Sequence, residues 1–342
     1  MTPVGMTRKA ETVVITGASA GVGRAAARAF AASGARLGLI ARRSEGLDAA
    51  VEEVRALGGS AIAIPADVAD AGAIEAAAGL VEERFGPIDV WVNAAMATVF
   101  APVSKTTAEE FRRATEVTYL GCVHGTLAAL KRMRERDHGT IVQVGSALSY
   151  RAIPLQAPYC AAKFAVRGFT DALRCELIHD RSNVHVTMVQ MPALNTPQFS
   201  WARNKTGFRP QPVPPIYQPE VAARAIVFAA HARRREVWVG WPSVKAILAQ
   251  RLVPGWLDHY LGRTGFKSQM TDEPADPGAP GNLFSPIPGD FGAHGRFDAR
   301  ATEICSQLPL TRNRAAIGAG LAALAAGLGA AAVFGRRHGN GR

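Results

Sequence analysis

ETVVITGASAGVGRAAARAFAASGA, residues 11–35, is the stretch that decides the fold of this chain. Its first six residues are mostly β-branched or apolar, which predicts a short buried strand, and its alanine-rich second half predicts a helix. Gly17, Gly21 and Gly23 lie in the turn between the two. Such glycines let the backbone approach a pyrophosphate at a helix N-terminus, although a tight turn can also need glycine for steric reasons alone.

Strand and helix patterns continue to alternate along the chain. The further strand patterns fall at residues 35–43, 60–68, 88–97, 139–146, 184–191 and 235–240. Sustained alternation of this kind favours a parallel sheet with helices on both faces. We therefore predict the α/β class, with a doubly wound, Rossmann-type parallel sheet of about seven strands.

Two arginines, Arg42 and Arg43, end the second predicted strand. A dinucleotide fold that prefers NAD places an acidic residue here, against the ribose 2′-hydroxyl. Guanidinium groups instead attract a 2′-phosphate and can bind it through two hydrogen bonds. The pair therefore favours NADP over NAD, unless both arginines are merely exposed at the start of a helix.

The ends of the third and fourth predicted strands carry further candidates. Asp67 could accept a hydrogen bond from the adenine amino group while Val68 packs on the ring, or Asp67 could cap the helix that starts at about residue 70. Its position leaves both interpretations open. Asn93 and Ala94 end the next strand. Small residues there would let the backbone come near a cofactor ribose.

A second motif, SALSYRAIPLQAPYCAAK, covers residues 146–163. Tyr159 and Lys163 stand four residues apart in a helical pattern, so both side chains project from one face. An ammonium near a phenol lowers the phenol's pKa from about 10 towards neutral pH, as a general acid or base requires. Ser146 follows a buried strand pattern, and ligands of parallel sheets bind at the carboxyl ends of strands.

With these motifs in order, the chain resembles the short-chain dehydrogenase/reductase family over about residues 10–240. The resemblance rests on TGASAGVG, on NAA, and on a serine thirteen residues before YCAAK. It implies an NAD(P)-dependent oxidoreductase that interconverts a carbonyl and an alcohol, and a homo-oligomer. Tyr159 would exchange a proton with the substrate oxygen, Lys163 would hold the nicotinamide ribose and lower the Tyr159 pKa, and Ser146 would donate a hydrogen bond to that oxygen.

The resemblance also implies a set of cofactor-binding residues, with Thr196 at the nicotinamide carboxamide. This set is Gly17, Ser19, Gly21, Val22, Gly23, Arg42, Arg43, Asp67, Val68, Asn93, Ala94, Tyr159, Lys163 and Thr196. Thr118 departs from the pattern, because it stands where the family has an asparagine that supports a proton relay through water. We keep Thr118 as a catalytic candidate whose hydroxyl could hold that water. The alternative is a catalytically idle, NADP-binding scaffold or redox sensor tethered to a membrane.

Charge, cysteine spacing and the N-terminal sequence argue against a nucleic-acid partner, a metal site and secretion. The formal charge of +11 is spread over helical patterns and the C-terminal tail without interleaved aromatic residues, which indicates solvated helix faces and no nucleic-acid partner. The four cysteines lack disulfide or metal-ligand spacing, so we expect no metal site. The N-terminus lacks the apolar core of a signal peptide, which favours a cytoplasmic catalytic domain.

The chain exceeds what one doubly wound domain needs. We expect a catalytic domain at residues 1–245, a helical and Pro/Gly-rich extension at 246–311, and a C-terminal anchor at 312–342. Residues 315–334 contain no charge over the length that spans a bilayer core, and arginines flank them. Their alanines and glycines insert less readily than leucine, so a soluble packing helix is the alternative to a transmembrane helix. The loop with Trp201, Phe208 and Tyr217 suggests a small, hydrophobic substrate.

Overall fold

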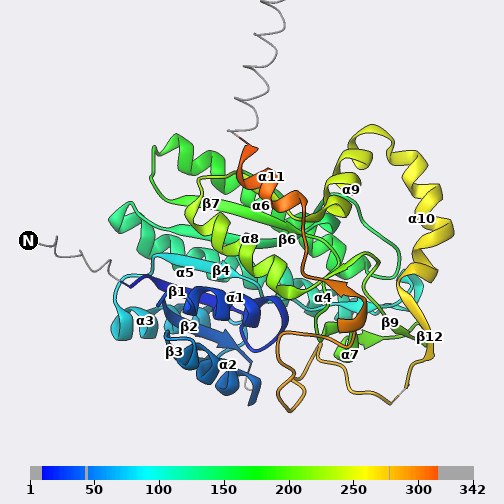
Figure 1. Cartoon of the computed structure of the whole chain (residues 1–342), viewed down its shortest axis with the longest axis horizontal. Coiled ribbons are helices and arrows are strands. Elements are labelled where there is room, and N and C mark those ends of the chain that lie inside the picture. The colour runs from blue at the N-terminus through cyan, green and yellow to red at the C-terminus, as the bar shows by residue number, and fades with distance from the viewer. Residues whose placement is uncertain (1–9, 43–44, 277, 315–342) are drawn as a thin grey trace, which may run out of the picture.

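A parallel seven-stranded sheet forms the centre of the molecule, with helices on both faces (Figure 1). This computed structural model describes residues 10–42, 45–276 and 278–314. In sheet order the strands are β11 (Glu236–Trp238), β7 (His185–Met191), β6 (Thr140–Ser146), β4 (Val90–Asn93), β1 (Thr12–Thr16), β2 (Arg36–Ala41) and β3 (Ser60–Pro65). Each neighbouring pair is parallel. The predicted doubly wound α/β sheet is therefore confirmed.

Alternating side chains of each strand supply two separate cores. One face is covered by α1 (Gly21–Ala31), α2 (Glu45–Ala56) and α8 (Pro219–His231), and the other by α3 (Ala71–Phe85), α4 (Ala108–Thr115), α5 (Gly121–Arg136) and α6 (Ala157–His179). Val13 and Ile15 of β1 are buried in the first core and Val14 in the second. Since strand side chains point to opposite faces in turn, a continuous apolar strand such as β1 must be covered on both sides.

The strand order reverses beside β1, which lies between β2 and β4. Thr16, the last residue of β1, is level with Ile40 on one side and with Asn93 on the other. The carboxyl ends of the central strands thus open at the same edge of the sheet. In doubly wound folds the crevice at such a reversal is where ligands bind.

A π-helical turn, Glu116–Leu120, joins α4 to α5 without a break. Hydrogen bonds in such a turn span one residue more than in an α-helix, and π turns often mark functional sites. Gly121 follows directly, and a Cβ atom there would lie 2.5 Å from a methyl group of Val68. This glycine therefore lets α5 pack closely against the segment that follows β3.

Residues 198–219 are more regular than their prolines suggest. They contain the short helix α7 (Gln198–Trp201) and three short strands, β8 (Arg203–Asn204), β9 (Phe208–Pro210) and β10 (Ile216–Tyr217). The strands β8, β9 and β10 pair with β5 (Val99–Phe100), β12 (Met270–Pro274) and β13 (Ala301–Thr302), in that order. Each pair joins segments that are distant in sequence. Proline does not prevent this, because the pairs are very short and lie outside the main sheet.

The C-terminal extension packs back onto the core instead of leaving it. Its helices are α9 (Gly240–Leu252), α10 (Pro254–Ser268) and α11 (Gln307–Arg312), and the chain between α10 and α11 crosses the lower right of Figure 1. The domain boundary predicted at residue 245 falls inside α9. Over the described part of the chain, no helix has the length and apolarity needed to cross a membrane. The predicted anchor at residues 315–334 and the candidate Arg43 lie outside the described residues.

Candidate active site

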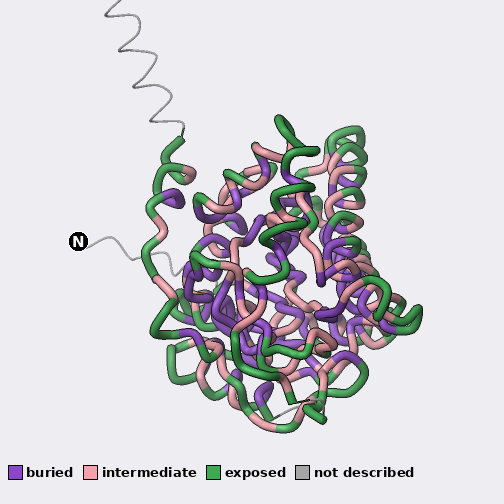
Figure 2. Tube along the Cα trace, turned by 90° about the vertical axis from the view of Figure 1, so that its right-hand side faces the viewer, coloured by how far each residue is buried: buried purple, intermediate pink, exposed green. Residues whose placement is uncertain are grey.

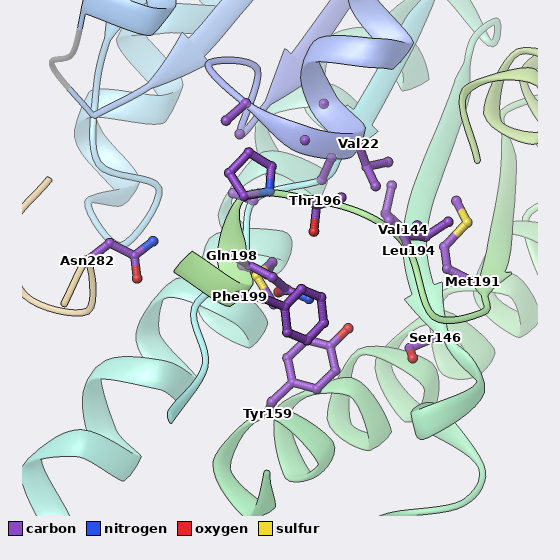
Figure 3. Close-up of a pocket in the computed structure, with 18 of the residues that line it drawn as sticks. Val22, Val144, Ser146, Tyr159, Met191, Leu194, Thr196, Gln198, Phe199 and Asn282 are labelled. Atoms are coloured by element: carbon purple, nitrogen blue, oxygen red, sulfur yellow. The ribbon is translucent and has the colours of Figure 1, made fainter. Parts of the chain in front are cut away.

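A cavity of about 400 Å³ opens at the carboxyl ends of the central strands. It runs from the glycine turn after β1 to the first turns of α6, and α7 forms part of its wall. Figure 3 shows Tyr159 and Ser146 on one side of it, with Val22 and Thr196 opposite. The cavity thus joins both sequence motifs in a single site.

The glycine turn fits a pyrophosphate. Gly17 has a φ of 71°, and a Cβ atom there would lie 2.7 Å from the Cα of Ala95, so only glycine suits this position. A Cβ atom on Gly23 would lie 2.1 Å from the carbonyl oxygen of Gly17. No side chain of a described residue caps the start of α1. Its first turn lines the cavity and offers N–H groups and a positive dipole end to an anion.

Ser146 ends β6 and is held by the short turn that follows. Its Oγ accepts a hydrogen bond of 3.1 Å from the N–H of Leu148, and the Ser149 hydroxyl accepts one of 3.3 Å from the N–H of Ser146. The Ser146 hydroxyl is buried yet lines the cavity. Because its oxygen accepts from the backbone, its own hydrogen is left for the cavity side, where the Tyr159 hydroxyl is its partner.

Lys163 is buried beneath Tyr159. Its Nζ donates a hydrogen bond of 2.6 Å to the carbonyl oxygen of Val144 and lies 5.6 Å from the centroid of the Tyr159 ring. Burial lowers the pKa of Lys163 to about 8. The ammonium therefore remains charged at neutral pH while facing the site.

The pKa of Tyr159 differs in direction from the sequence prediction. Burial in the cavity wall raises the pKa of this phenol, and a hydrogen bond with Ser146 only partly offsets that effect. The predicted lowering was therefore wrong, because burial of the phenol decides the direction of the shift, and Lys163 donates its hydrogen bond to the backbone of Val144 rather than to Tyr159. Tyr159 is therefore a protonated phenol at neutral pH.

The other end of the cavity is built around Arg42 and Asp67. Asp67 accepts hydrogen bonds from the N–H of Ala69, at 3.0 Å, and from Arg113. These hydrogen bonds lower its pKa although burial acts in the opposite direction. Asp67 does not cap α3, because the N-cap there is Asp70, whose side chain accepts from the N–H of Ala73. The capping interpretation is therefore wrong.

The C-terminal extension closes this end. Arg42 donates to the carbonyl oxygen of Asn282 at 2.5 Å and to that of Leu283 at 3.5 Å, and Arg113 donates to Leu283 at 3.3 Å. Burial lowers the pKa of Arg42. The N–H of Gly21 in the glycine turn donates to the carbonyl oxygen of Gly292 at 3.0 Å. The extension therefore contacts both the second strand and the glycine turn.

Most of the predicted site residues meet in the cavity lining that the described chain forms. They are Gly17, Ser19, Gly21, Val22, Gly23, Arg42, Asp67, Val68, Ala94, Ser146, Tyr159, Lys163 and Thr196. Two of the predicted residues that the structure describes are not part of this lining. Asn93 accepts from Trp91 and donates to Thr126 and Gln143 in the core, at 2.8 to 3.1 Å. Its neighbour Ala94 reaches the cavity instead.

Thr118 also lies away from the cavity, in the π-helical turn. Its hydroxyl accepts from the N–H of Ala97 at 2.9 Å and donates to the carbonyl oxygen of Ala97 at 3.1 Å. Its one proton is thus already donated, so it cannot also be donated to a water of a relay. The structure gives Thr118 a role in joining the π-helical turn to the segment that follows β4.

Several lining residues have no signal in the sequence. Phe199, Ile153 and Gln156 line the region near Tyr159, while Asn282 and Phe291 come from the extension. Of the predicted aromatic loop, Trp201 lines the cavity. Phe208 is exposed instead, and Tyr217 is buried beside Gly240. Such positions depend on tertiary contacts between distant segments, which local patterns do not encode.

Comparison with known proteins agrees with this geometry. Residues 11–206 match the family model for short chain dehydrogenases. An uncharacterized oxidoreductase, YxnA of Bacillus subtilis, is 32% identical over 271 residues, which are 79% of this chain and 76% of that protein. Dehydrogenase/reductase SDR family member 7B of Mus musculus is 36% identical over 191 residues, 54% of this chain and 58% of that protein.

A solved structure shows the same likeness. The alcohol dehydrogenase of the archaeon Thermococcus sibiricus, complexed with 5-hydroxy-NADP, superposes with a TM-score of 0.57 and 28% sequence identity. The match covers 67% of this chain and 95% of the archaeal chain. The family model alone covers more than half of the chain. The protein therefore belongs to the short-chain dehydrogenase family of oxidoreductases.

Proposed function

We propose that this oxidoreductase interconverts a carbonyl and an alcohol by hydride transfer, with NADP as its cofactor. The observation that carries the proposal is the meeting of Ser146, Tyr159 and Lys163 in the same cavity as the glycine turn. A proton donor, a hydrogen-bond donor and a buried positive charge then surround the place where the substrate oxygen would lie.

Each side chain has a role that follows from its state. A nicotinamide cofactor would supply or accept the hydride. Tyr159, protonated at neutral pH, donates its proton to the oxygen that gains charge during reduction. Ser146 donates a second hydrogen bond to that oxygen. Lys163, which is charged below its pKa of about 8, stabilises the phenolate that remains.

The proposal of NADP rests on Arg42. It lines the cavity at the end of β2, where a ribose 2′-phosphate would lie, and no acidic residue takes its position. Arg113 supplies a second guanidinium nearby. The archaeal alcohol dehydrogenase was solved with 5-hydroxy-NADP, which supports the same choice.

We assign a small apolar carbonyl compound or alcohol as the substrate. Phe199 lies next to Tyr159 (Figure 3), and the apolar side chains of Ile153 and Val213 also line the cavity. An apolar wall with few polar groups fixes a ligand through those polar groups and excludes water from the reaction.

The test is a screen with the purified full chain. Ketones and aldehydes of increasing apolar size are added with NADPH or NADH, and absorbance follows cofactor oxidation. We expect turnover of at least one apolar carbonyl, faster with NADPH, that is lost in Tyr159→Phe. Tight NADPH binding without turnover of any carbonyl would contradict the enzyme and favour the idle NADP-binding scaffold.

We also propose that residues 315–334 anchor the chain in a membrane, while the catalytic domain remains in the cytoplasm. The support is their uncharged sequence and the arginines on either side. Full-length protein expressed in cells should sediment with membranes and be released by detergent but not by high salt. Recovery of the full chain in the supernatant without detergent would remove this proposal.

A homo-oligomer, which the family favours, can be tested by sedimentation in detergent.

A further inference from the structure

The hairpin formed by α9 and α10 stands at the edge of the molecule, at the right of Figure 1. Figure 2 turns this edge towards the viewer and shows many of its residues as exposed. Ile247, Leu257 and Gly265 hold the hairpin on its inner side. A Cβ atom on Gly265 would lie 2.7 Å from Pro154, so α10 packs closely on the core there. The outer side has no such cover.

Each helix of the hairpin carries a row of exposed residues. On α9 the row is Trp241, Lys245, Leu248 and Leu252, and on α10 it is Trp256, Tyr260, Arg263 and Lys267. These residues are exposed and follow helical spacing, so each row lies along one face of its helix. Leu252 is 78% exposed and Trp256 62%. Exposed apolar side chains gathered in this way mark an interaction surface.

The charge of the hairpin is one-sided. Residues 240–268 contain Lys245, Arg251, Arg263 and Lys267 but only one acidic residue, Asp258. Asp258 is paired with Arg151 of the core, at 2.7 Å. Within the described part of the chain, Lys245, Arg263 and Lys267 form no ion pair. Large apolar side chains beside unpaired basic ones are typical of helices that lie in the interface of an anionic membrane.

The C-terminal end of the described chain lies beside this surface. Gln307 at the start of α11 accepts a hydrogen bond of 2.9 Å from the N–H of Gly240, and Trp241 donates to Ser306 at 3.3 Å. The start of α11 therefore lies beside the first residue of the α9 row. A second copy of the chain is a poor partner for the hairpin, because two surfaces of the same positive charge would repel each other.

We propose that the outer face of α9 and α10 binds the surface of an anionic lipid membrane, with Trp256 and Leu252 inserted among the lipids. The proposal goes beyond the oxidoreductase function and does not depend on it. It is also separate from the anchor, since it concerns residues 240–268. Its consequence is an orientation: the side of the catalytic domain that carries the hairpin would lie against the membrane.

Tryptophan fluorescence of the full chain can test this contact. The protein is mixed with vesicles of phosphatidylcholine and phosphatidylserine whose acyl chains carry bromine, which quenches a tryptophan that contacts them. We expect quenching in the wild type and loss of most of it in the double variant Trp241→Phe, Trp256→Phe. Trp238→Phe, which removes a half-buried tryptophan of β11, is the matched control and should keep the quenching.

Residues 315–342 contain no tryptophan, so insertion of the anchor alone would leave the fluorescence unquenched. Unquenched wild-type protein, or equal quenching in the double variant, would overturn the proposal. The proposal would also be overturned if the wild type sediments as a dimer, Trp256→Glu disrupts this dimer, and the fluorescence stays unquenched. If basic residues attract the lipid, Arg263→Gln and Lys267→Gln should each raise the lipid concentration for half-maximal quenching roughly 5-fold. Equal response to vesicles of phosphatidylcholine alone would contradict the preference for anionic lipid.

Discussion

The two ends of the cavity are assembled in different ways. At the reacting end, Ser146, Tyr159 and Lys163 come from β6 and α6, which follow each other in the chain. At the far end, Arg42 is bound by the carbonyls of Asn282 and Leu283, about 240 residues further along. The first end therefore depends on a local motif, and the second on how the extension returns to the core. Substitutions at each end should differ in what they damage.

Tyr159→Phe should produce the largest effect, at the reacting end. It removes the hydroxyl that donates the proton and leaves the ring that packs in the cavity wall. We expect carbonyl reduction to slow by about 10²- to 10⁴-fold while NADPH binding is retained. Steady-state kinetics measures the rate of carbonyl reduction, and fluorescence titration measures NADPH binding. Tyr119→Phe is the control, because its hydroxyl binds no described residue. A comparable rate loss in the control, or none in Tyr159→Phe, would contradict the assignment.

Arg42→Asp should be the largest effect at the far end. A carboxylate would repel the 2′-phosphate and lose a charged hydrogen bond, so the Kd for NADPH should rise about 10- to 100-fold. The Kd for NADH should change much less. Arg55→Asp, on the exposed side of α2, is the control for added negative charge. If both cofactors lose equal affinity, Arg42 only fastens the extension and does not select NADP.

The fold was predictable because its signals are local. Apolar strands such as Thr12–Thr16 must be covered on both faces, and alternation with helices allows little besides a doubly wound sheet. The π-helical turn at Glu116–Leu120 has no comparable signal. The short strand pairs of residues 198–219 were also missed, because each joins segments far apart in sequence.

The site was predictable where backbone geometry alone determines it. Gly17 and Gly23 must be glycine, and Tyr159 and Lys163 share a helix face, so their positions follow from spacing. The direction of the Tyr159 pKa did not follow, because it depends on burial and on where the Lys163 ammonium points. Asn93 illustrates the same limit: it ends the correct strand, but its side chain turns into the core to bind Trp91.

Lys163→Met probes the buried charge at the reacting end. The pKa of Lys163 is lowered from 10.5 to about 8, so between these values only the unfolded chain holds the proton and stability rises with pH. Below pH 8 the Lys163 side chain is charged in both the folded and the unfolded chain, so the free-energy cost of burying its charge no longer changes with pH. From pH 8 to pH 9 the wild type should gain about 1 kcal/mol of unfolding free energy relative to the variant. Urea unfolding of both proteins checks this, and parallel pH profiles would contradict it.

Asp290→Asn should give the smallest effect, at the far end. Asp290 lies in the extension and pairs at 3.2 Å with Arg24, a buried residue of α1 that also pairs with Glu53 at 2.9 Å. Because Asp290 is partly exposed and Arg24 keeps its second partner, the loss should stay below about 1 kcal/mol. We expect the KM for NADPH to rise about 2- to 3-fold with kcat unchanged, since the part of the extension around Asp290 lies over the cofactor end.

Asp272→Asn, an exposed substitution in β12, is the matched control and should change neither constant. A fall in kcat with an unaltered KM would mean that the extension acts on the reacting end, and the distinction between the two ends would fail. If KM rises for NADPH and NADH alike, the extension holds the part of the cofactor that both share. A rise for NADPH alone would instead link Asp290, through the extension, to the position of Arg42.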